Sequence, residues 1–111
     1  MTLDDALRST IDDLGQLLDH IDRSDHGLKN RHRRVIELEL DSLHRLESEL
    51  SRPPLPRRSW SLGQASIPIL NSMLNAIQRS AVDVPNLLLV RARQSVFNLA
   101  EALNRLAEGQ D

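Results

Sequence analysis

The chain has 111 residues, a net charge of −2 and no cysteine. This length suits one domain, and the lack of cysteine excludes disulfides, thiolate zinc sites and a cysteine nucleophile. Aromatic residues are only 2% of the sequence, which removes the stacking platforms of single-strand binders, and the near-neutral charge disfavours nucleic acid as a partner.

A helical hairpin is predicted over residues 2–52. Its first helix begins at a capping box formed by Thr2 and Asp5, and its second helix ends before a proline-rich segment. Both helices carry apolar residues at spacings of three and four, which is typical of a stripe packed against a neighbouring helix. The first stripe is Leu7, Ile11, Leu14, Leu18 and Ile21. The second is Ile36, Leu40, Leu43, Leu46 and Leu50, widened by Val35 and Leu38.

The prolines at positions 53, 54 and 56 predict a stiff, extended linker over residues 53–59. A second hairpin is expected over residues 60–109. For its first helix we expect a short helical turn over residues 60–65, then a main helix from Ile67 with Pro68 in its first turn. A start at a capping box of Ser61 and Gln64 is the alternative, but Pro68 would break or kink that helix.

The last helix is predicted to begin at a cap on Asp83 and to end at Gly109. Its heptad-spaced stripe is Leu89, Ala92, Val96, Leu99, Leu103 and Leu106. The run from Leu87 to Val90 covers every side of a helix. We therefore expect the start of this helix to be buried all round, or to lie in an oligomer interface such as that of a homodimer.

Together these patterns predict an all-α protein, a small bundle of about four amphipathic helices formed by two hairpins in one domain over residues 1–111. The longest aliphatic run, Leu87 to Val90, falls far short of the ~20 residues that a membrane span requires. The first residues also show no secretory signal. We expect a cytoplasmic protein.

The stretch from His26 to Asn30 resembles the His-x-Leu-Lys-Gly core of histidine phosphotransfer domains, which are four-helix proteins of similar length. The resemblance implies a phosphorylated His26, with Lys29 neutralising the phosphoryl group. The sequence departs from that pattern because Asn30 replaces the glycine, Gly27 indicates a turn, and Arg31-His32-Arg33-Arg34 follows. Phosphotransfer by His26 is thus an alternative function, and a solvated turn is the reading that we favour.

Neither a catalytic, a cofactor nor a metal site is predicted. Asp41 and His44 are spaced like half of a carboxylate-bridged di-metal site, but residues 53–111 contain no histidine that could supply the second half. A surface pair three residues apart is the expectation here. We predict that the protein is not an enzyme and needs no cofactor.

The remaining candidates are residues that could bind a partner protein. On the first helix, Asp5, Asp12 and Asp19 are seven residues apart, with Asp22 beside them, and would form an acidic ridge about 20 Å long. A basic cluster follows at Arg31, Arg33 and Arg34, and it offers nucleic-acid binding as a second alternative. Trp60 is expected to anchor the linker or to be an interface hot spot. The favoured function is a small regulator, adaptor or inhibitor, of the kind that phages and mobile elements encode.

Overall fold

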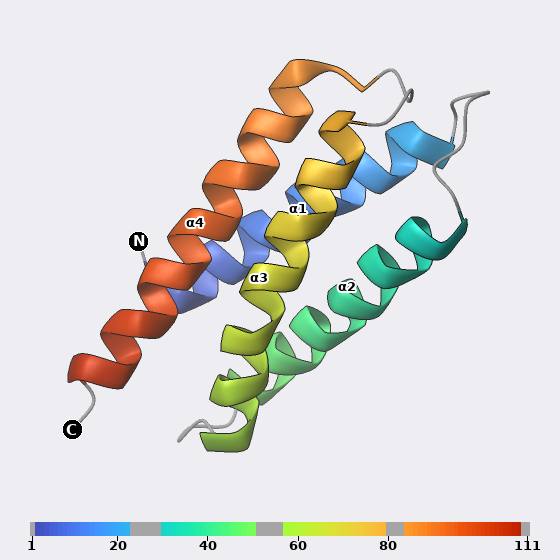
Figure 1. Cartoon of the computed structure of the whole chain (residues 1–111). Coiled ribbons are helices and arrows are strands. Elements are labelled where there is room, and N and C mark those ends of the chain that lie inside the picture. Colours follow the sequence, from blue (N-terminus) through green and yellow to red (C-terminus); the bar gives the residue numbers. More distant parts are fainter. Residues whose placement is uncertain (1, 23–29, 51–56, 80–83, 110–111) are drawn as a thin grey trace.

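The computed structural model describes residues 2–22, 30–50, 57–79 and 84–109. They form four helices, α1 (Leu3–Asp22), α2 (Asn30–Leu50), α3 (Arg57–Arg79) and α4 (Asn86–Gly109), and no strand is present among the described residues (Figure 1). The predicted all-α bundle is therefore confirmed.

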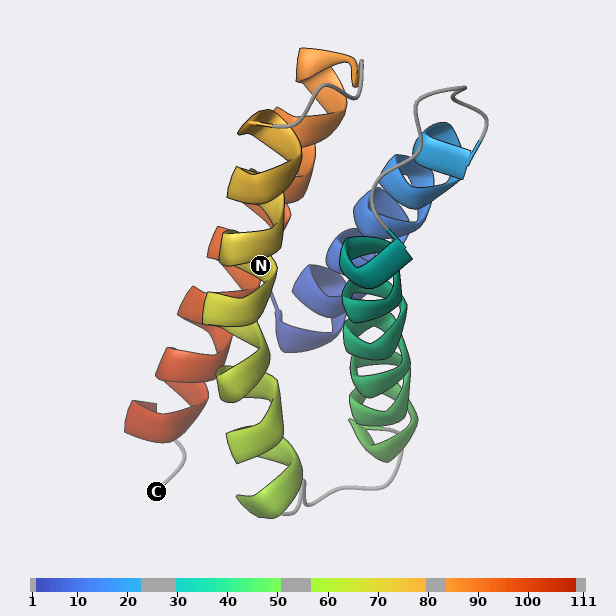
Figure 2. The same cartoon turned by 45° about the vertical axis from the view of Figure 1, so that its right-hand side comes forward.

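The helices are arranged as two hairpins that lie side by side (Figure 2). Consecutive helices run antiparallel, and α1 also packs against α4, so that each helix contacts two neighbours around the bundle. The bundle is elongated, with extents of 48 × 20 × 19 Å. Its long axis follows the helices, which leaves one long face of each helix toward solvent.

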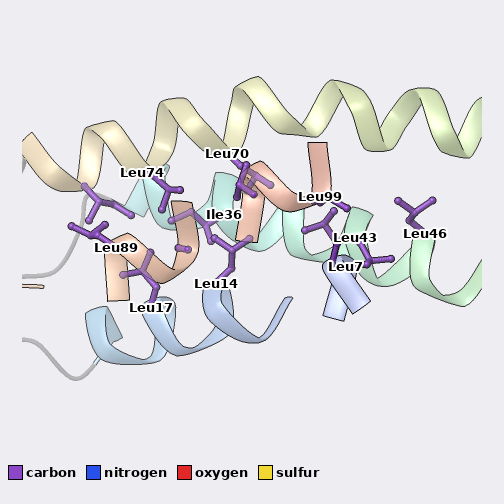
Figure 3. Packing of buried hydrophobic residues seen from close by; sticks show 14 of the residues in the cluster. Leu7, Leu14, Leu17, Ile36, Leu43, Leu46, Leu70, Leu74, Leu89 and Leu99 are labelled. Carbon is purple, nitrogen blue, oxygen red and sulfur yellow. The ribbon is translucent and has the colours of Figure 1, made fainter. Parts of the chain in front are cut away.

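The core is aliphatic and receives side chains from all four helices (Figure 3). Its largest fully buried members are Leu7, Leu14, Leu17, Ile21, Ile36, Leu43, Leu70, Leu74, Ile77, Leu99, Leu103 and Val96. Each such side chain stabilises the fold by about 1.5–3 kcal/mol relative to an exposed one. Because both hairpins contribute, each one covers apolar surface of the other.

Small side chains allow α1 and α4 to approach closely. Ala6 and Thr10 on α1 and Ala92 and Ser95 on α4 are all buried. The Thr10 hydroxyl hydrogen-bonds the Ala6 carbonyl at 2.8 Å and the Ser95 carbonyl at 3.1 Å. The Ser95 hydroxyl in turn donates to the carboxylate of Asp13. The buried hydroxyls of Thr10 and Ser95 therefore both have hydrogen-bond partners. The spacing of the leucines alone does not predict this polar contact between α1 and α4.

The start of α1 is as predicted, since the backbone amide of Asp5 donates to the Thr2 hydroxyl at 3.2 Å. The buried face of α1, however, is rotated around the helix relative to the predicted stripe. Leu17 is fully buried, whereas Ile11 and Leu18 are only half-buried. The reason is that α1 packs against both α2 and α4, so its buried face is wider than a seam made with one neighbour and is shifted toward α4.

The predicted division of the third helix is wrong. α3 is continuous from Arg57 to Arg79 with Pro68 in its interior. Pro68 lies on the exposed face, where its ring meets solvent. Residues before and after it in the chain are buried, which favours one continuous helix over two separate ones. Residues 57–59 of the predicted linker also belong to α3, because Ser59 is buried against the bundle. The rest of that linker, including Pro53 and Pro56, lies outside the described residues.

The beginning of α4 also differs from the prediction. Leu89 is buried, but Leu87 is 57% exposed and Val90 is 52% exposed. All-round burial at this end is therefore wrong, because among the described helices α4 packs only against α1 and α3. The stripe from Leu89 to Leu103 is confirmed as core, and the cap at Asp83 lies outside the described residues.

Candidate interaction surfaces

The outer face of α1 is acidic. Asp5, Asp12 and Asp19 are exposed, and their positions on the helix are opposite the buried face that contains Leu7 and Leu14. With about 1.5 Å of rise per residue, the three span roughly 21 Å along the helix. The predicted ridge therefore exists as a geometric feature, while the side chain of Asp22 is outside the description.

Basic groups near this ridge are engaged with acids. Arg8 bridges Asp4 at 3.4 Å and Glu47 of α2 at 3.8 Å. His44 Nδ1 lies 4.0 Å from the same Glu47 carboxylate. These pairs are exposed and each contributes about 0–1 kcal/mol. Their effect on the surface is that Arg8 is neutralised and the α1 face keeps its negative sign.

The basic cluster on α2 is only partly described. Arg33 is exposed and its Nε lies 3.1 Å from the Glu37 carboxylate, one turn later. Arg34 is exposed as well, and the side chain of Arg31 lies outside the description. A guanidinium paired with a carboxylate in this way offers a weaker contact to a phosphate than a cluster of arginines alone would.

Trp60 is part of α3 and joins it to α4. The side chain is half-buried, and its indole Nε1–H donates to the Leu103 carbonyl at 3.0 Å. Gln64, one turn later, donates to the Asn104 side chain at 3.1 Å. Trp60 thus anchors one helix to another, which is close to the predicted anchoring of the linker, and only part of its ring remains accessible to a partner.

An apolar stripe is exposed on the outer face of α4. It consists of Leu87, Val90 and Phe97, with exposures of 57%, 52% and 56%. Their spacings of three and seven residues place them on one side of the helix. Exposed apolar residues are common singly, whereas several on one helix face form a candidate contact surface.

A second group of exposed apolar side chains belongs to α3 and α2, and the patterns described above did not predict it. Leu62 is 54% exposed, Ile69 is 40% exposed, and Leu38 of α2 is 53% exposed. Leu38 was expected to widen the buried stripe, and that expectation is wrong because it points away from the core. The signal that could have revealed this surface is the absence of charge in the twenty residues 59–78.

The two hairpins differ in charge. Helices α1 and α2 together contain eleven acidic and five basic residues, whereas α3 and α4 contain six arginines and two glutamates. The net charge of −2 therefore conceals an acidic hairpin and a basic one. Such polarity orients an approaching charged partner before contact.

The described residues show no group of three or more potential metal ligands. Asp41 and His44 are both exposed, as a surface pair would be. His26 and Lys29 lie outside the described residues, so the phosphotransfer resemblance stays a prediction. None of the described helices has the length and apolarity needed to cross a bilayer.

Comparison of the chain with protein-family models, with curated proteins and with solved structures finds no match.

Proposed function

We propose that the protein is a non-enzymatic protein–protein interaction module, a small cytoplasmic regulator, adaptor or inhibitor that acts through its helix faces. The observation that carries the proposal is the exposure of six large apolar side chains. They are Leu38, Leu62, Ile69, Leu87, Val90 and Phe97. Five of these belong to the hairpin of α3 and α4, which carries the net positive charge.

The α4 stripe supports self-association as one form of this function. Leu87, Val90 and Phe97 follow a straight helix face, and two such faces can pack against each other as helices do in a coiled coil. A homodimer formed in this way would cover the apolar groups that the four-helix bundle leaves exposed on α4. The α3 surface would remain open for a different molecule.

The acidic ridge supports a role in the approach of a basic partner. Charges on an exposed helix mainly raise the rate of association and contribute little to the affinity. They act within a Debye length of about 8–10 Å at physiological salt. We assign the ridge to steering and the apolar faces to the contact itself.

The proposal is tested by placing a photo-cross-linking amino acid at position 97 in one variant and at Ser48 in another, each expressed in the native host. Ser48 is an exposed polar control on α2. We expect protein adducts at position 97 that are absent at position 48. Equal labelling at both positions would contradict the proposal, and phosphate transfer from a receiver domain that depends on His26 would establish the alternative.

A further inference from the structure

The outer face of α3 lacks charge. None of the twenty residues 59–78 is charged, although 27% of the chain is, a proportion that predicts about five in such a segment. Helices α1, α2 and α4 all carry charged residues on their exposed faces. Solvated helix faces are normally charged, and the centre of a protein interface is the place where charges are depleted.

The exposed residues of this face have the spacing of a helix–helix seam. Leu62, Ala65, Ile69, Ser72 and Ala76 follow one another at intervals of three, four, three and four residues. The first four are exposed and Ala76 is half-buried. Large and small side chains along this seam form the knobs and holes that a second helix would fill.

Leu38 of α2 widens the same surface. A Cβ at Gly63 would lie 2.9 Å from Leu46 Cδ2, so these residues are opposite each other. Because α2 and α3 are antiparallel, moving back along α2 corresponds to moving forward along α3. Leu38 lies eight residues before Leu46, so it is level with residues 69–71, which lie about eight residues after Gly63. Leu62 borders a depression that α2 residues Ser42 and Arg45 also line, and Ile69 lies two turns further along that side.

Arginines mark both ends of the seam. Arg58 at the start and Arg79 at the end are exposed, and they are separated by 21 residues, or about 31 Å of helix. The α3 helix of a second copy does not suit this surface, because it would bring arginine next to arginine in either orientation. The charge pattern instead matches a helix that is apolar in the middle and acidic at both ends.

We propose that the outer face of α3, with Leu38 beside it, binds an amphipathic helix of a partner protein that carries carboxylates at both ends. The proposal rests on the interaction function proposed above and assigns the partner's chemistry and the surface that receives it. This is recognition of a helix in a groove, with apolar anchors for affinity and terminal charges for selection.

The probe is a synthetic, fluorescent, 24-residue helical peptide with leucine and alanine at heptad positions and glutamates at both ends. A control peptide has lysines in place of the glutamates. Fluorescence anisotropy should show at least tenfold tighter binding of the glutamate peptide. Ile69→Gln should weaken that binding at least tenfold, while Ser48→Gln, at the exposed polar control position of α2, should leave it unchanged.

The double variant Arg58→Glu/Arg79→Glu should reverse the preference and bind the lysine peptide. Both arginines are exposed, so circular dichroism should show an unchanged fold. Equal binding of the two peptides, or failure of both to bind, would overturn the proposal. A change in sedimentation mass caused by Ile69→Gln would also overturn it, by assigning the face to a second copy. Self-association through α4 is measured by sedimentation and not by peptide binding. One of the two proposals can therefore fail while the other holds.

Discussion

At the scale of single residues, Gly15 and Gly63 both lie inside helices but have opposite surroundings. A Cβ at Gly15 would have no neighbour within 4 Å, whereas one at Gly63 would lie 2.9 Å from Leu46 Cδ2 and 3.6 Å from the Leu103 side chain. A methyl group at Gly15 would therefore meet no obstacle. Gly63 allows α3 to pack closely against α2 and α4.

We expect Gly15→Ala to stabilise the fold by about 0.5–1 kcal/mol, because alanine is the better helix former and nothing obstructs its methyl group. Gly63→Ala should gain less, since the end of Leu46 must move, and Gly63→Leu should destabilise the fold by about 1–3 kcal/mol through overpacking. Urea denaturation followed by circular dichroism measures all three. Equal effects of alanine at the two sites would contradict the packing described here.

Trp60 provides a second test at this scale. Replacing it with Phe keeps an aromatic ring but removes the 3.0 Å hydrogen bond to the Leu103 carbonyl. The expected loss of stability is about 0.5–1.5 kcal/mol, the net contribution of one such bond. An unchanged urea midpoint would show that the indole does not hold α3 against α4.

At the scale of elements, Pro68 is the main local conflict. A proline inside a helix lacks the amide hydrogen and costs about 3 kcal/mol relative to alanine. α3 nevertheless continues through Pro68, because residues are buried both before and after it in the chain. These are Ser59, Gly63 and Ser66 before Pro68, and Leu70, Leu74 and Ile77 after it. The packing of both segments offsets the local cost.

Pro68→Ala should therefore raise the free energy of unfolding by about 1–3 kcal/mol, since position 68 is exposed and no packing is lost. The denaturation midpoint should increase while the slope stays constant. Destabilisation by this substitution would indicate that α3 is not one regular helix across residue 68.

The number and type of elements could be predicted from the sequence, because stripes such as Ile36–Leu43 and Leu89–Leu103 are long and regular. The edges of each buried face could not. Ile11 and Leu38 are as apolar as Leu17, and only the arrangement of neighbouring helices decides that Leu17 is buried and Leu38 exposed. A local rule for proline likewise could not anticipate that tertiary packing carries α3 through Pro68.

The candidate surfaces were predictable to different degrees. Seven-residue spacing was enough to place Asp5, Asp12 and Asp19 on one exposed face. The α3 face was missed because its seam, from Leu62 to Ala76, has the same periodicity as a buried one. Only the exposures distinguish a stripe that faces the core from one that faces solvent.

At the scale of the whole molecule, charge polarity predicts a kinetic effect. Reversing Asp5, Asp12 and Asp19 to Lys should slow association with a basic partner strongly and leave helix content intact, because all three are exposed. Stopped-flow association at low and at half-molar salt measures the effect. Association that is indifferent to both the substitutions and the salt would remove the ridge from the mechanism and shift attention to Arg33 and Arg34.

The central claim is that apolar side chains left exposed by the bundle are covered by another protein chain, and α4 allows a test that needs no identified partner. Replacing Leu87, Val90 and Phe97 together with Gln should leave the chain folded, because each residue is more than half exposed and glutamine favours helix at least as well as valine or phenylalanine. The triple variant is thus a matched control for self-association.

Sedimentation equilibrium at micromolar concentrations is the most direct measurement. We predict that the wild-type chain sediments with twice its 12.6 kDa mass and that the triple variant sediments as a folded monomer. A wild-type monomer throughout this range, or a dimer that the three substitutions leave unchanged, would contradict the assignment of the α4 stripe as a contact surface.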